Sequence, residues 1–190
     1  MKLETIKETY LAAQFPNRYR VLFWKLKPLS LGHALLLEWL ESPFVTAARL
    51  PNRLDCALVI ALCSRNLQQA ERLARSRIIR WHLRRFMPFQ FQAELAVLQI
   101  IRYTSHFRVV PQCWESTQGG RTCGTPFLEA VKITNMALLH RTEAEALALP
   151  LSLAIHDSSA IQELKGKIKI PNEAEYTAMA VEKSMSGRRN

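Results

Sequence analysis

Residues 26–44 read LKPLSLGHALLLEWLESPF, and this strongly apolar stretch between two prolines decides the fold. Ser30 is a favourable N-cap, and the residue before Pro43 avoids the helical region, so the sequence predicts a helix over residues 31–41. The preceding run 19–27, YRVLFWKLK, is rich in aromatic and β-branched residues, which indicates extended backbone.

Apolar periodicity, caps and prolines predict further helices on both sides of this stretch. They are expected at residues 3–14, 54–64, 67–86, 88–103, 127–140, 143–149 and 150–161, and after Asn172. The alternating run 165–170, KGKIKI, indicates a strand that can pair with residues 19–27, whereas residues 105–124 look irregular. We therefore expect a mainly α fold: a single-domain, multi-helix orthogonal bundle over residues 1–185 with one minimal two-stranded β pairing, followed by a disordered basic tail, 186–190.

Composition favours a cytoplasmic protein that does not bind membranes. No apolar run reaches the ~20 residues that span a bilayer. The N-terminal MKLETIKETY carries acidic residues where a signal peptide has its apolar core. Cys56 and Cys63 lie in an apolar stretch, and Cys113 and Cys123 flank a loop. We expect all four cysteines to be reduced and structural.

The net charge of +10 is unevenly distributed along the chain. Residues 65–110 carry nine arginines and two glutamates, whereas residues 111–190 carry equal numbers of basic and acidic side chains. Because the excess is all arginine, this segment favours partners with phosphate or carboxylate groups, which guanidinium groups bind in planar, bidentate pairs.

The arginines of the helix expected over residues 67–86 are the candidate binding residues. At ~100° per residue, Arg77, Arg80 and Arg84 fall within an arc of about 60°. Together with Arg85 they form the predicted partner-binding set. Three interpretations remain open: a solvated amphipathic helix, a surface that docks an acidic protein, and a nucleic-acid surface.

No motif predicts an enzyme, a metal site or a cofactor. His156 and Asp157 are adjacent, so on a helix they point ~100° apart and form no relay by themselves. His33 lies within an apolar helix, and the apolar surroundings of Cys63 should raise its pKa and weaken it as a nucleophile. Structural zinc sites usually have ligands two to four residues apart, and this spacing is missing among four candidate ligands, His106, Cys113, Cys123 and His140.

Three blocks together resemble a known kind of protein. They are residues 26–44, residues 55–73 (DCALVIALCSRNLQQAERL) and residues 124–154 (GTPFLEAVKITNMALLHRTEAEALALPLSLA). The combination is similar to small helical proteins found among phage and prophage tail-morphogenesis genes, which are associated with tail assembly chaperones. The helix near residues 156–161 departs from this pattern, because HDSSAI lacks the aromatic residues expected there.

The resemblance implies a non-catalytic chaperone in the bacterial host cytoplasm. Such a protein binds a long, helical tape-measure-like structural protein before the tail tube polymerises around it, by a helix-in-groove mode. The sequence leaves self-association open. The alternative is a basic nucleic-acid-binding protein or a structural protein that stays in the finished particle.

Overall fold

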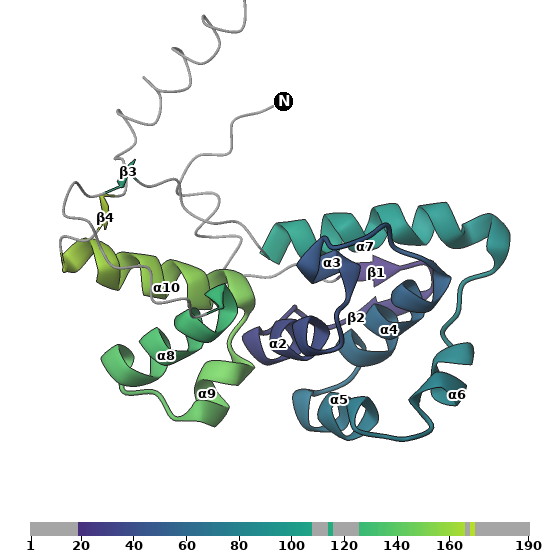
Figure 1. The fold of residues 1–190 in the computed structure, drawn as a ribbon, viewed down its shortest axis with the longest axis horizontal. Coiled ribbons are helices and arrows are strands. Elements are labelled where there is room, and N and C mark those ends of the chain that lie inside the picture. The colour runs from purple at the N-terminus through teal and green to yellow at the C-terminus, as the bar shows by residue number, and fades with distance from the viewer. Residues whose placement is uncertain (1–18, 108–113, 116–125, 166–167, 170–190) are drawn as a thin grey trace, which may run out of the picture.

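The computed structural model describes residues 19–107, 114–115, 126–165 and 168–169. They form a mainly helical fold with two very short antiparallel strand pairs, which confirms the predicted fold class (Figure 1). Its elements are β1 (Tyr19–Val21), β2 (Trp24–Leu26), α2 (Leu31–Trp39), α3 (Pro43–Thr46), α4 (Arg53–Cys63), α5 (Leu67–Ala74), α6 (Ile79–Arg84), η1 (Gln90–Gln92), α7 (Ala93–Phe107), β3 (Trp114–Glu115), α8 (Phe127–Leu139), α9 (Glu143–Ala148), α10 (Leu151–Leu164) and β4 (Ile168–Lys169).

Some predictions concern segments outside the described residues: the helices over 3–14 and after Asn172, and the tail 186–190. The segment expected to be irregular from residue 105 begins as helix, because α7 continues to Phe107. Among the helices that the structure describes, none combines the length and the apolar character needed to cross a lipid bilayer.

The end of α2 is set by its own backbone rather than by the following proline. Glu41 adopts a left-handed conformation with a φ of 54°. Its N–H donates to the Glu38 carbonyl, and the N–H of Ser42 donates to the Leu37 carbonyl, both at 2.9 Å. These two bonds form a Schellman motif, so α2 ends two residues earlier than predicted, and Pro43 begins α3 instead of stopping α2.

The strand pairing predicted between residues 19–27 and 165–170 is wrong. Residues 19–26 fold back on themselves as a hairpin of β1 and β2, and β4 pairs with β3. A residue of another element stabilises the hairpin turn: the Leu22 N–H donates to Oε1 of Gln99 in α7 at 2.7 Å. A two-residue turn closes at a lower entropy cost than a pairing across more than 100 residues, which favours the local partner.

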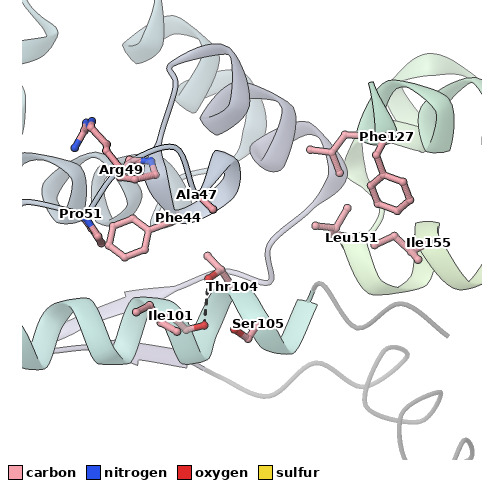
Figure 2. A pocket seen from close by; sticks show the side chains of 12 residues that line it. Phe44, Ala47, Arg49, Pro51, Ile101, Thr104, Ser105, Phe127, Leu151 and Ile155 are labelled. Carbon is pink, nitrogen blue, oxygen red and sulfur yellow. Dashed lines mark hydrogen bonds between the residues drawn. The ribbon is translucent and has the colours of Figure 1, made fainter. Parts of the chain in front are cut away.

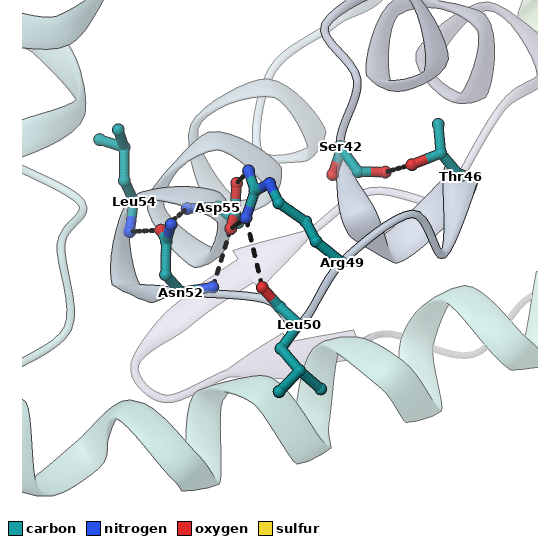
Figure 3. Close-up of polar contacts among 7 residues, drawn as sticks. All are labelled: Ser42, Thr46, Arg49, Leu50, Asn52, Leu54 and Asp55. Carbon is teal, nitrogen blue, oxygen red and sulfur yellow. Dashed lines mark hydrogen bonds and ion pairs between the residues drawn. The ribbon is translucent and has the colours of Figure 1, made fainter.

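The predicted buried helix is confirmed as α4, the helix at the centre of the core. Its residues 55–63 are all buried. Figure 3 shows its start, where the Asn52 side chain accepts from the Asp55 N–H and Asp55 accepts from the Asn52 N–H in a capping box. Both carboxylate oxygens of Asp55 accept from Arg49, each at 2.6 Å, so this buried charge is paired.

α2 connects the two ends of the molecule in Figure 1, with α4 to α7 on one side and α8 to α10 on the other. A Cβ at Gly32 would lie 2.5 Å from the Leu67 side chain of α5 and 3.0 Å from the Leu147 carbonyl of α9. Glycine therefore lets α2 pack closely between helices from both ends. A single antiparallel bridge joins the starts of α2 and α10: the Leu151 N–H donates to the Leu29 carbonyl at 2.8 Å.

Candidate partner-binding surface

The helix predicted over residues 67–86 is wrong, because the chain turns between two shorter helices, α5 and α6. At the turn the Ser76 hydroxyl accepts a hydrogen bond from the Ile78 N–H at 3.3 Å. Such side-chain contacts compete with continuation of a helix. The turn allows Leu73 of α5 and Leu83 of α6 to be buried in the same core beside α4.

The four predicted arginines consequently do not share one helix face. Arg77 lies in the turn, Arg80 in the first turn of α6, and Arg84 and Arg85 at the C-terminal end of α6. The predicted arc assumed a continuous helix that does not exist. The side chains of Arg77, Arg84 and Arg85 are exposed, and none of the ion pairs formed among the described residues includes them.

Two of these arginines line a cavity of about 550 Å³ between α4 and α6. We call it the arginine pocket, and its lining residues are Arg65, Trp81, His82, Arg84, Arg85 and Phe86. Sequence analysis did not connect Arg65 with the others, because their proximity depends on the turn after α5.

Arg65 is held in the pocket by two contacts. Its guanidinium group donates to the Ala61 carbonyl at the end of α4 and lies 4.9 Å from the centre of the buried Phe86 ring. Burial, together with the neighbouring charge of Arg85, lowers the pKa of Arg65 below its ordinary value. The fold therefore concentrates like charges here and fixes one of them in place.

A second surface lies on α7. Leu95, Leu98 and Ile101 fall within an arc of about 120° on the side opposite the buried face of this helix. Their exposed fractions are 51%, 65% and 45%, which is high for large apolar side chains. We call these three residues the outer stripe. Glu94 and Arg102 lie within the same arc and are exposed.

The outer stripe ends at an apolar cavity of about 750 Å³. Figure 2 shows its walls, formed by α3 and the following loop, by α7, and by the starts of α8 and α10. The residues that give the cavity its apolar character are Pro43, Phe44, Ile101, Phe127, Leu151 and Ile155.

Two polar side chains at the cavity are already paired. Arg49 binds Asp55, and the Thr104 hydroxyl donates to the Ile100 carbonyl of its own helix at 3.0 Å. Ile101 belongs to both the outer stripe and the cavity wall, so the two form one continuous apolar surface. By its chemistry, this surface suits apolar side chains of another molecule.

The chain matches no protein-family model, and it matches no curated protein or solved structure.

Sequence analysis missed the outer stripe. The signal was present, because residues 93–107 place large apolar side chains on both faces of α7, whereas a helix at the surface of a domain usually has one apolar face. Apolar periodicity alone predicts that such a helix is fully buried. Only the packing of α7 in the structure shows that one of its faces is exposed.

The residues considered for catalysis are buried or paired within the fold. His33 is buried with its Nδ1 2.8 Å from the Ser30 hydroxyl, and burial lowers the pKa of His33 to about 4. Asp157 pairs with Arg141 at 2.8 Å. Burial also lowers the pKa of His156.

The two cysteines that the structure describes, Cys56 and Cys63, are free and buried in α4, as predicted. Burial raises the pKa of Cys56 to about 11 and that of Cys63 to about 12. Cys113 and Cys123 lie outside the described residues. Within the part of the chain that the structure describes, no three histidine, cysteine or acidic side chains gather into a group that would hold a metal ion.

Proposed function

We propose that this protein is a non-catalytic assembly chaperone of the phage tail type, which binds a long helical, tape-measure-like protein during virion morphogenesis. The proposal takes the class of partner from the sequence resemblance. The structural observation that supports it is the apolar surface formed by the outer stripe and the cavity that Ile101 joins to it.

This surface has the chemistry of a helix-binding site. An amphipathic helix presents apolar side chains at intervals of three and four residues and docks them against an apolar groove. The outer stripe repeats at three-residue intervals, and the cavity beyond Ile101 can receive a large anchoring side chain. Glu94 and Arg102 flank the stripe with opposite charges, which favours one orientation of the bound helix over the other.

A long partner can also contact the arginines around α6. Arg77, Arg80, Arg84 and Arg85 are the residues that this proposal assigns to acidic groups of the partner, as charge complementarity that accelerates association. This assignment is separate from the apolar surface, because none of these four arginines lines the apolar cavity next to Ile101.

The test is a pull-down of the tagged full chain from its native context after nuclease treatment. Mass spectrometry should find one abundant, very long helical protein, and mature particles should lack the chaperone. Recovery of nucleic acid without a protein partner would overturn the proposal, and the presence of this chain in mature particles would identify a structural protein instead.

A further inference from the structure

The arginine pocket concentrates positive charge, and none of the described residues that line it is acidic. Arg65 enters from the end of α4, and Arg84 and Arg85 enter from the end of α6. None of the ion pairs among the described residues involves these three side chains. Cations are favoured at helix C-termini, which explains each position singly, but not three cations in one pocket without a carboxylate.

The aromatic side chains show what kind of anion fits. Trp81 lines the same pocket and is 66% exposed, and the ring of His82 lies edge-on to it with ring centres 5.2 Å apart. An exposed indole beside cationic groups is an arrangement that stacks nucleic-acid bases while the cations contact the backbone. A carboxylate alone would leave the indole and most of the 550 Å³ unused.

We propose that the arginine pocket binds the phosphate group of a nucleotide, with the base stacked on Trp81. Arg65 is the fixed contact, since the Phe86 ring and the Ala61 carbonyl already orient its guanidinium group. Arg84 and Arg85 are exposed and close on the phosphate from the other side. The nucleotide is either free or a unit of a single strand, because the two share this chemistry. This site goes beyond the proposed helix-binding function and lies apart from the apolar surface, but it shares Arg84 and Arg85 with the charges assigned to the helical partner.

The experiment is isothermal titration calorimetry of the full chain with adenosine monophosphate, inorganic phosphate, a thymidine oligonucleotide and a polyglutamate peptide. Arg85→Gln and Arg65→Gln should each weaken nucleotide binding at least tenfold, and Trp81→Leu should weaken nucleotide binding but leave phosphate binding within twofold. Arg72→Gln, which removes an exposed arginine of α5 outside the pocket, is the matched control and should change binding less than twofold.

Arg85→Gln keeps the test decisive if Arg65→Gln unfolds, because Arg85 is exposed and forms none of the contacts that hold Arg65. Oligonucleotide binding much tighter than monophosphate binding identifies a strand as the source, and equal affinities identify the free nucleotide. The proposal is overturned if Arg72→Gln weakens binding as much as Arg85→Gln, if the wild-type chain binds no nucleotide, or if only polyglutamate binds. Retention of the helical partner by Arg65→Gln would show that the two surfaces are independent.

Discussion

Arg141, in the turn between α8 and α9, donates from Nη1 to Oδ2 of Asp157 in α10 at 2.8 Å. The same nitrogen donates to Oδ1 of Asn135 in α8 at 2.5 Å. The amide nitrogen of Asn135 donates to the carbonyls of Val131 and Ala154, at 2.9 and 3.0 Å. One fully buried side chain thus joins α8 to α10 and to the turn that carries Arg141.

Replacing this side chain should destabilise the C-terminal helices. Asn135→Ala removes the acceptor of Arg141 and the side-chain donor to the Ala154 carbonyl of α10, so we expect the free energy of unfolding to fall by about 2–3 kcal/mol. Urea denaturation measures the change. Gln68→Ala, at an exposed position of α5, is the control, with an expected change within about 0.5 kcal/mol. Equal effects of the two substitutions would contradict a structural role for the network.

Stability should decrease as the pH falls below neutrality, and His33 is a main cause. Its pKa is lowered to about 4 in the folded state, whereas an unfolded histidine has a pKa of about 6.5. Between these values the unfolded chain binds a proton that the folded chain does not. The free energy of unfolding is therefore reduced progressively from pH 6.5 to pH 4, by up to about 3 kcal/mol from this residue.

The measurement is urea denaturation at several pH values, compared between the wild-type chain and His33→Gln. The substitution should flatten the dependence between pH 6.5 and 4, because the histidine no longer takes up a proton on unfolding. Gln68→Ala, which changes an exposed side chain that does not titrate, should leave the slope as it is in the wild type. A slope that His33→Gln does not alter would assign the effect to other groups.

The outer stripe should be required for partner binding but not for folding. Leu98→Asp places a charge on the face that docks the helix, and we expect at least a tenfold loss of recovered partner in the pull-down, since a buried unpaired carboxylate is strongly unfavourable. Leu164→Asp changes another exposed leucine, far along the chain in α10, and should leave recovery unchanged. Thermal melting should be similar for both variants, which would show that both are folded. If the two folded variants recover equal amounts of partner, α7 does not belong to the binding surface.

The four arginines predicted from the sequence allow a separate test. Changing Arg77, Arg80, Arg84 and Arg85 together to glutamate should abolish partner binding and leave thermal stability nearly intact, because the surface charge that steers the partner is reversed. If the apolar surface binds the partner without help from these arginines, binding would survive the change. That result would remove the arginines from the docking surface without removing the chaperone function.

The thiols of α4 should be protected in the folded state. Cys56 and Cys63 are buried and their pKa values are raised to about 11 and 12, so few thiolates are present at pH 8. With Cys113 and Cys123 changed to serine, labelling by a disulfide reagent should be on the order of 100-fold slower than in urea, since reaction requires opening of the core. Fast labelling without denaturant would mean that α4 is not in a stable core.

Local signals in the sequence were sufficient for most of the fold. The Ser30 cap, the apolar run of α4, and the capping box of Thr142 and Glu145 predict their helices, because each depends on neighbours within a few residues. The gathering of Arg65, Arg84 and Arg85 in the arginine pocket could not be predicted in the same way. Their positions depend on a turn at Ser76 and on packing against α4, both of which are tertiary effects.

The hairpin and the outer stripe show the same limit. Alternation indicates extended backbone over residues 19–27 but does not select its partner, and in the structure this run folds back on itself as a hairpin. Apolar periodicity predicts that α7 is a helix but does not predict how many of its faces pack against other helices. Candidate surfaces of this kind are therefore found from the packing and not from the pattern.

The bridge that pairs Ser30 with Pro150 has a consequence for synthesis on the ribosome. The two residues are about 120 positions apart, yet α2 is covered partly by α8, α9 and α10. While the chain is still being translated, α2 exposes that apolar side until the last of these helices has left the exit tunnel. The nascent protein therefore passes through a long interval in which it can aggregate, and a product truncated before residue 126 would remain in that state.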